Sequence, residues 1–347
     1  MLRWEIKKIL KDKSNITALV LMVILFLQIS FLKPMLETQN KNWDDAKGEY
    51  VTDTRSGDVI ANEKLKTKVD QIKSVADSSE EDKTYIDISR EQLKLDAGDK
   101  YEDIAFYTVF TARENYQMSI IIMLIIILLV VPNLYTDEVV VDTAPIILSS
   151  KNKNKVLFSK LGVSILLPIL LYGLYIAYVW IITCMQYGQP INGGLQAYRV
   201  CDPVFITKAV TISQYAISRI IVTGLILLGV SIASMLISFL SNNLLKSIVL
   251  SVGFVISGKV FGGFGLLPNS ILTAFGYLIN EIVIIASKFN YVNVALGTSQ
   301  IGGVYNGKLD VLSKSLDISN ICISMYGLIV VFGILGCIYK IKKIAVK

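Results

Sequence analysis

The feature that most constrains this chain is a series of apolar blocks, each about as long as a lipid bilayer is thick. An α-helix needs about 20 mainly apolar residues to cross the hydrocarbon core of a membrane. Only 18% of the residues are charged, against about 25% in a typical soluble domain. The sequence therefore predicts an all-α integral membrane protein with six transmembrane helices, at residues 16–33, 117–134, 156–183, 216–240, 247–267 and 321–339.

The distribution of basic residues decides between six and seven spans. Residues 271–286 form a further apolar stretch, which Asn280 and Glu281 interrupt. Five Lys or Arg residues precede the first span, four lie in residues 135–160, and four lie in the C-terminal tail. Cytoplasmic flanks carry the excess of basic residues, and six spans place all three segments on that side. Because a charge in lipid is costly, we expect residues 271–286 to form an outer re-entrant hairpin within residues 268–320.

The segments between the spans differ in charge and pattern. Residues 1–15 alternate apolar and basic side chains, which predicts an amphipathic helix on the cytoplasmic membrane surface. Residues 34–116 hold 19 of the 28 acidic residues and are predicted to form a helical extracellular domain. We expect a multi-pass protein of a bacterial plasma membrane with both termini in the cytoplasm. The remaining predicted segments are a cytoplasmic loop at 135–155, an extracellular loop at 184–215 and a cytoplasmic tail at 340–347.

The composition excludes several classes of active site. The chain has no histidine, so it lacks the commonest general base and the commonest zinc ligand. Its four cysteines form no C-x-x-C pair. Residues 302–308 match a phosphate-loop pattern, but Leu309 stands where that loop needs Ser or Thr. We therefore expect no enzymatic activity, no metal, no directly bound cofactor and no nucleic acid.

Polar side chains inside the predicted spans are candidates for a transport pathway. Tyr172, Tyr175 and Tyr178 recur every three residues in the third span. They could line an amphipathic cavity, although an aromatic belt would explain those near the outer interface. Lys259 lies near the middle of the fifth span. It could line a pathway, form a structural ion pair or extend toward the outer surface.

Two residue pairs indicate helix packing and a possible crosslink. Gly258 and Gly262 form a G-x-x-x-G pair, which permits close contact between helices. That contact could lie within one subunit or form the seam of a dimer. Cys184 and Cys201 bracket an outer loop of 18 residues counted inclusively. A disulfide between them is chemically permitted outside the cell.

The most informative segment is the loop between the second and third predicted spans. Glu138 follows the second span, Thr143 comes five residues later, and Lys160 lies at the start of the third span. The residues between them are an apolar run and a serine pair followed by basic residues, namely Ile146, Ile147, Leu148, Ser149, Ser150, Lys151 and Lys155. This order resembles the six-helix permease subunits of ABC exporters. Asp142 stands where that family usually has glycine, and Lys151 where it often has proline.

The resemblance implies a function for the whole chain. In such permeases this loop forms a coupling helix, here carried by Glu138, Thr143 and residues 146–155, that sits in a groove of a separate ATPase. ATP and Mg would then be bound by that partner, and a second permease copy or a related permease would complete the transporter. The exported substrate would be an amphipathic peptide, antibiotic or lipid. Residues 1–15 would correspond to the elbow helix of these permeases, and the outer hairpin is also a family feature.

Two other functions remain open from the sequence. The extracellular domain is large enough to bind a ligand or partner in a sensor or assembly scaffold that transports nothing. An intramembrane enzyme is disfavoured because histidine is absent. A neighbouring gene for a soluble chain with a phosphate loop and an ABC signature would favour the transporter.

Overall fold

The computed structural model describes most of the chain, and the part that it describes is mostly helical. It covers residues 2–11, 13–44, 48–78, 83–114, 116–202, 206, 208–241, 243–264, 308–311 and 314–346. Three helical stretches among these residues are long and apolar enough to cross a membrane, namely Ala105–Val140, Lys153–Tyr187 and Ile212–Leu240. Two shorter apolar helical stretches are Ile16–Phe31 and Leu244–Val255.

A helix overlaps the described part of each of the six predicted spans, but only three helical stretches have the length and hydropathy to cross a membrane. The helices of the bundle, in chain order, are α1 (Leu2–Lys11), α2 (Lys13–Phe31), α5 (Ala105–Glu114), α6 (Gln117–Val130), α7 (Asn133–Val140), α8 (Ala144–Ser149), α9 (Lys153–Tyr187), α10 (Ile212–Leu240), α11 (Leu244–Phe264) and α15 (Ile318–Val346). The second predicted span is one part of a longer stretch, because α5 begins inside the segment predicted as extracellular domain. The predicted loop at 135–155 is also largely helical, since it contains most of α7 and all of α8.

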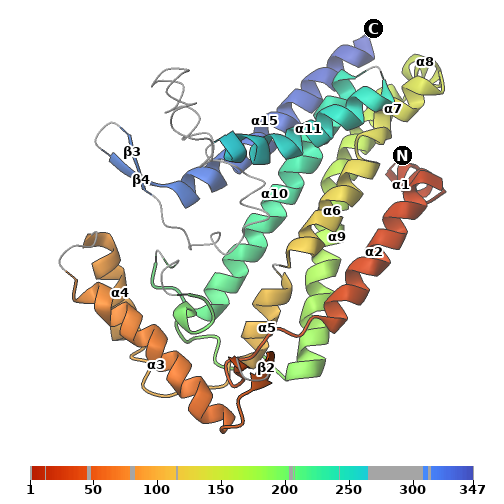
Figure 1. Cartoon of the computed structure of the whole chain (residues 1–347). Coiled ribbons are helices and arrows are strands. Elements are labelled where there is room, and N and C mark those ends of the chain that lie inside the picture. Colours follow the sequence, from red (N-terminus) through yellow and green to blue (C-terminus); the bar gives the residue numbers. More distant parts are fainter. Residues whose placement is uncertain are drawn as a thin grey trace.

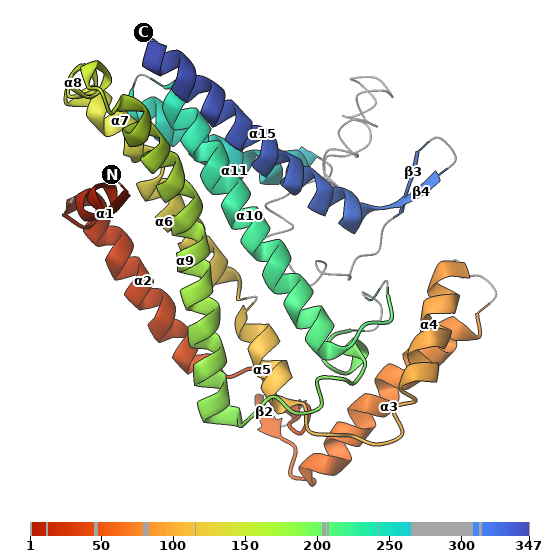
Figure 2. The same ribbon diagram turned by 180° about the vertical axis from the view of Figure 1, so that it is seen from behind.

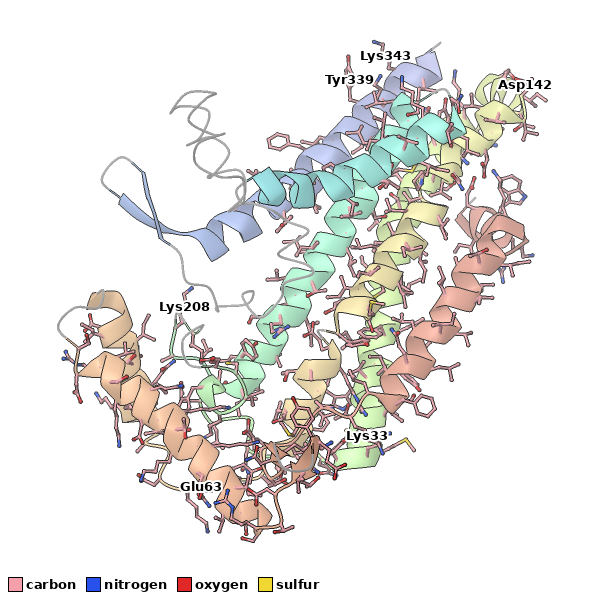
Figure 3. All side chains as sticks on the ribbon, viewed as in Figure 1. Lys33, Glu63, Asp142, Lys208, Tyr339 and Lys343 are labelled. Atoms are coloured by element: carbon pink, nitrogen blue, oxygen red, sulfur yellow. The ribbon has the colours of Figure 1, made fainter. Side chains whose placement is uncertain are left out.

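The bundle has two distinct ends. The start of α1, helix α8 and the end of α15 lie together at one end, and α3 (Gly57–Ala76) and α4 (Lys83–Leu95) lie toward the other (Figures 1 and 2). The labelled side chains agree, since Asp142 and Lys343 lie far from Lys33 and Glu63 (Figure 3). The three basic segments that the sequence analysis placed on one side therefore share one end of the fold.

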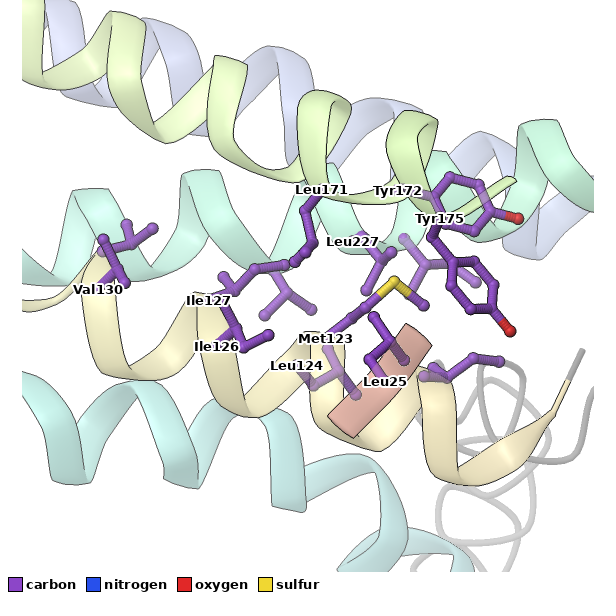
Figure 4. Packing of buried hydrophobic residues seen from close by; sticks show 14 of the residues in the cluster. Leu25, Met123, Leu124, Ile126, Ile127, Val130, Leu171, Tyr172, Tyr175 and Leu227 are labelled. Atoms are coloured by element: carbon purple, nitrogen blue, oxygen red, sulfur yellow. The ribbon is translucent and has the colours of Figure 1, made fainter. Parts of the chain in front are cut away.

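Apolar side chains from several helices, α2, α6, α9 and α10 among them, fill the interior of the bundle. Met123 and Ile127 of α6 are fully buried, with Leu25 of α2, Tyr175 of α9 and Leu227 of α10 (Figure 4). Many apolar side chains on the outside are exposed, which suits helices that face lipid rather than water. The bundle thus has a closely packed apolar interior and an apolar outer surface.

The closest glycine-mediated helix packing described lies between α10 and α15. A Cβ atom on Gly333 of α15 would come within 2.6 Å of Cγ2 of Ile232 on α10. The pair predicted for such packing, Gly258 and Gly262, lies in α11, and its surroundings fall outside the described residues. The sequence analysis did not identify Gly333.

The described part of residues 34–104, which we call the outer domain after the predicted location of segment 34–116, contains two helices and one short β-hairpin. Strands β1 (Lys41–Asp44) and β2 (Glu49–Thr52) pair antiparallel, and α3 packs against α4. The buried face of α3 completes its core with residues of the segment after α9, where η1 spans Ala197–Arg199, and of α10. The residues of this second apolar cluster are Leu65, Val69, Ile72, Ala197, Tyr198, Ile206 and Tyr215. The outer domain therefore shares an apolar core with α10 and the segment after α9.

The region before the last helix differs from the all-α prediction where the structure describes it. Strands β3 (Lys308–Val311) and β4 (Lys314–Asp317) form an antiparallel hairpin that leads directly into α15. The predicted re-entrant hairpin at 271–286 lies outside the described residues. The described residues are thus mostly helical and include two short β-hairpins, which the all-α prediction did not contain.

Candidate coupling site

A buried lysine connects the two ends of the predicted coupling loop. Lys160 of α9 is fully buried, and its Nζ donates to Oε1 of Glu138 on α7 at 2.7 Å. The same Nζ donates to the carbonyl of Leu134 at 2.6 Å. The two residues that bracket the loop in sequence therefore meet in space. This ion pair holds the beginning of α9 against α7.

Helix α1 contributes two more charges to the same site. Glu5 is 1% exposed, and its Oε1 lies 3.3 Å from Nζ of Lys160. Lys8 approaches the other carboxylate, with its Nζ 3.1 Å from Oε1 of Glu138. We call Glu5, Lys8, Glu138 and Lys160 the lysine cluster. It joins α1, α7 and α9, and the sequence analysis foresaw only its Glu138 and Lys160.

The protonation of Glu5 reflects this crowded arrangement. Burial raises its pKa above the usual range, and the nearby carboxylate of Glu138 adds to that rise. The attraction of Lys160 and Lys8 lowers the pKa but does not outweigh burial. One ammonium shared between two buried carboxylates therefore compensates Glu5 incompletely.

The spacing of Glu138 and Thr143 has a local structural cause. The backbone N–H of Thr143 donates to the carbonyl of Glu138 at 3.0 Å, and that of Asp142 donates to Val139 at 3.3 Å. Asp142 itself has φ 54°. These are the bonds and the left-handed residue of a Schellman motif, in which glycine is the preferred residue. Asp142 therefore stands at a position that demands a positive φ, which Asp tolerates.

Helix α8 presents apolar side chains at the tip of this arrangement. Ile146 is 69% exposed, and Val140 and Val141 just before α8 are also exposed. Ser149 and Ser150 are exposed, and their hydroxyls donate to carbonyls within the same turn. Lys151 and Lys155 are exposed as well, whereas the surroundings of the Leu148 side chain fall outside the described residues. Five of the predicted coupling residues are therefore exposed, whereas Glu138 is buried in the lysine cluster and Thr143 is half-buried.

The three predicted pathway tyrosines lie in the helix bundle and bond to the protein. The hydroxyl of Tyr172 donates to Glu114 at 2.9 Å, and that of Tyr175 donates to the carbonyl of Arg113 at 2.6 Å. The hydroxyl of Tyr178 bonds to that of Ser30. The fourth predicted pathway residue, Lys259, lies in α11, and its side chain falls outside the described residues.

The disulfide that the sequence permits between Cys184 and Cys201 is not formed in the structure. Cys184 and Cys201 are both free. Cys184 packs against the apolar core of the bundle, whereas Cys201 packs against the cluster shared with the outer domain. Cys201 instead directs its Sγ to the carbonyl of Ala197 at 3.0 Å, and burial raises its pKa to about 12. The two cysteines belong to different cores.

The sequence analysis missed two further sets of charges. Asp96 and Arg199, which we call the arginine clasp, join the outer domain to the segment after α9 through two hydrogen bonds of 2.6 and 2.7 Å. Glu114 and Arg219 lie buried together within the candidate spans, 3.5 Å apart. Arg219 was visible as a lone charge in the fourth predicted span, which is a signal of a buried polar site.

Comparison of the chain with protein-family models, curated proteins and solved structures finds no match. The geometry alone therefore describes what the site can do. A short helix with an exposed apolar side chain follows α7 through the turn in which Thr143 N–H donates to the carbonyl of Glu138, and buried charges join α7 to α1 and α9. Force applied to that short helix would reach three helices of the bundle together.

Proposed function

We propose that the chain is the membrane-spanning permease subunit of an ABC exporter with six transmembrane helices. Helix α8 would be its coupling helix, α1 its elbow helix at the cytoplasmic membrane surface, and residues 268–320 would hold an outer re-entrant element. A separate ATPase would bind ATP and Mg, and a second permease would complete the complex in a bacterial plasma membrane. The observation that carries this proposal is the attachment of exposed α8 to the buried lysine cluster.

The exposed side chains of the α8 segment support a protein partner. Ile146 and Val141 are each 69% exposed. Both lie in the short segment between the second and third predicted spans, where no lipid would be expected to cover them. Adjacent exposed apolar side chains with a polar rim are typical of a protein-binding surface. A groove on an ATPase would cover them.

The lysine cluster supports coupling rather than simple anchoring. Closure of an ATPase can be passed on only if the docked helix moves with the spans as one body. Glu138 is bonded to Lys160 of α9 and contacts Lys8 of α1. Removing one member of a buried charge set leaves the others uncompensated, so these helices resist separation. The cluster would therefore transmit a tilt of α8 to α1 and α9.

The experiment that tests this proposal is co-purification of the tagged full-length chain from its native membrane. We expect a soluble chain with a phosphate loop and an ABC signature to be recovered with it. Ile146→Asp places a charge on the exposed face of α8 and should abolish that recovery. Ile191→Asp is the matched control, because Ile191 is 51% exposed and lies beyond the other end of α9. Undiminished recovery with Ile146→Asp would contradict the proposal.

A second candidate is a sensor or assembly scaffold that uses the outer domain. The observation that favours it is the shared core, in which Val69 of the domain packs with Tyr198 and with Tyr215 of α10. A ligand that moved the domain would therefore move α10. Absence of an ATPase partner, together with a ligand-dependent change in the hydrogen exchange of α10, would favour this function instead.

A further inference from the structure

A helix break and a buried charged pair coincide in the part of the bundle nearest the outer domain. Helix α5 is described as far as Glu114, and Tyr116, directly before α6, has an extended backbone (φ −65°, ψ 115°), although both helices lie in one candidate span. The hydroxyl of Tyr175 donates to the carbonyl of Arg113 and so satisfies one backbone group at this break. Broken helices within a membrane protein are found where the backbone lines a polar site.

The pair consists of Glu114 from α5 and Arg219 from α10. Glu114 is 1% exposed and Arg219 is 5% exposed. Oε1 of Glu114 accepts from Tyr172 at 2.9 Å, and Nη1 of Arg219 donates to the hydroxyl of Tyr215 at 2.6 Å. The guanidinium also lies over the ring of Tyr215, 5.3 Å from its centroid. Two tyrosines therefore orient the two charged groups.

Each charged group keeps one buried atom without a hydrogen-bond partner among the described residues. Oε2 of Glu114 lies 3.5 Å from Nε of Arg219 but accepts no hydrogen bond, and Nη2 of Arg219 donates none. An unsatisfied buried polar atom costs about 1–3 kcal/mol. The contrast with Arg113 is informative, because each nitrogen of its guanidinium has a partner, provided by Leu32, Thr183 and Gln186. Other described side chains also have an unpaired buried atom, Oε1 of Glu5 among them. Here, however, an unpaired acceptor and an unpaired donor belong to the two members of one ion pair.

The net charge of the Glu114–Arg219 pair indicates which kind of chemical group could bind there. A carboxylate and a guanidinium together are neutral, and Arg113 directs its own charge toward α2 and α9. A cation or an anion added to a neutral buried pair would leave one charge uncompensated. A neutral group with one donor and one acceptor would satisfy both Oε2 of Glu114 and Nη2 of Arg219. An amide has this pattern.

We propose that Glu114 and Arg219 form an internal binding site for a neutral amide group of an amphipathic molecule. The amide N–H donates to Oε2 of Glu114, and the amide carbonyl accepts from Nη2 of Arg219. The apolar remainder of the molecule lies among the side chains of the bundle. This site rests on the proposed transport function for its biological substrate, because an amphipathic peptide would supply such amides, but binding itself needs no ATPase.

The test measures thermal unfolding of the full-length chain in lipid nanodiscs at rising concentrations of four probes that share a six-carbon chain. Hexanamide has the required donor and acceptor, and N,N-dimethylhexanamide keeps only the acceptor. Hexanoate and hexylammonium carry opposite charges. Ligand binding to the folded state raises the unfolding temperature with concentration and so yields Kd. Hexanamide should bind at least about tenfold more tightly than each other probe, since a lost hydrogen bond to a charged group has about that effect.

Two variants assign the binding to this pair. Glu114→Gln keeps the size of the side chain but replaces the acceptor Oε2 by a donor, and Arg219→Lys removes Nη2. Each should weaken hexanamide binding at least about tenfold. Tyr178→Phe is the control, because it removes a hydroxyl from α9 that bonds to Ser30 rather than to the pair. That control should keep the affinity of the unaltered chain.

Three results would overturn the site. These are equal binding of hexanamide and N,N-dimethylhexanamide, tighter binding of a charged probe, and unchanged affinity in folded Glu114→Gln or Arg219→Lys protein. If neither variant folds, the comparison of the two amides on the unaltered chain decides alone, because both are neutral and partition into lipid. No ATPase is present in this assay, so its failure is distinct from a failure of coupling.

Discussion

The lysine cluster and the arginine clasp join distant segments by buried charges, yet they are built in opposite ways. In the clasp, Arg199 donates to both oxygens of Asp96, and the backbone N–H groups of Gly98 and Gln196 donate to the same carboxylate. In the cluster, two buried carboxylates share the ammonium of Lys160. A carboxylate with several donors is stabilised as an anion, whereas one that shares its counter-ion is not.

The pKa shifts follow this difference. Burial opposes ionisation of Asp96, but the hydrogen bonds and charge of Arg199 outweigh it and hold the pKa of Asp96 below its usual range. For Glu5, burial outweighs the attraction of Lys160, and the pKa lies above its usual range. The arginine clasp is therefore a well-compensated ion pair, which suits two segments that keep one relative position. The cluster is a less compensated arrangement, and it lies where the proposed function requires helices to move together.

The largest effect is expected from breaking the lysine cluster. Lys160→Met would leave Glu5 and Glu138 buried without their shared cation. This should lower the free energy of unfolding by about 3–5 kcal/mol, measured by thermal or denaturant unfolding in detergent. Adding Glu5→Gln and Glu138→Gln to Lys160→Met should restore much of the loss. Equal stability of Lys160→Met and the unaltered chain would show that the cluster does not hold these helices.

Breaking the arginine clasp should cost less and act elsewhere. Arg199→Met removes charged hydrogen bonds to Asp96, which are worth about 1.5–3 kcal/mol each in proteins. Because Asp96 keeps two backbone donors, the lower end of that range is expected for the variant. Hydrogen exchange should accelerate in α3 and α4 and stay unchanged in α7 and α8. Acceleration spread equally over both ends would argue against two separate joints.

A smaller effect is expected at the Schellman motif beside the lysine cluster. Asp142 has φ 54°, so Asp142→Gly should relieve backbone strain and raise the free energy of unfolding by about 1 kcal/mol. Gly173→Ala on α9 serves as a control, because it replaces glycine at a position with ordinary helical backbone. A Cβ there would meet open space, and Ala is favoured over Gly inside a helix, so this variant should not be destabilised. A destabilised Asp142→Gly variant would mean that the Asp side chain is needed for another reason.

The smallest effect concerns the pH dependence of stability that Glu5 and Asp96 contribute. The folded state holds a proton on Glu5 above its ordinary pKa of 4.5, so the free energy of unfolding should rise as pH falls through the raised pKa toward 4.5. Asp96 behaves oppositely, and its contribution should be lost as pH falls below its ordinary value of 3.8. Unfolding curves of Glu5→Gln and Asp96→Asn between pH 7 and 3 should lack the rise and the fall, respectively.

The sequence predicted the helices and part of the site for a definite physical reason. Apolar length and the placement of basic residues are local properties, and so is the order from Glu138 to Lys160. The partners Glu5 and Lys8 were missed because they reach this site only when α1 folds back onto α9. Glu5 and Lys160 are 155 residues apart in the chain. The left-handed Asp142 was seen as a departure from a glycine pattern but not explained until the backbone was known.

The charges at the other end show the same limit. Asp96 and Arg199 stood in segments rich in charged and polar residues, where nothing in the sequence distinguished them from a solvated surface. Glu114 lay at the edge of a predicted span, and its pairing with Arg219 depends on α5 and α10 meeting in the fold. Close packing at Gly333 was likewise invisible, because it depends on which residue of α10 faces it. Local sequence patterns do not show which residues, far apart in the chain, contact each other in the fold.

The central claim is that α8 is the surface where an ATPase binds. Its most direct measurement is photo-crosslinking in native membranes, with a crosslinking amino acid placed at Ile146 or, in a second protein, at Ile191. The account predicts a crosslink from position 146 to a chain with a phosphate loop and an ABC signature, and none from position 191. Absence of that crosslink at position 146, or equal yield at both positions, would contradict it.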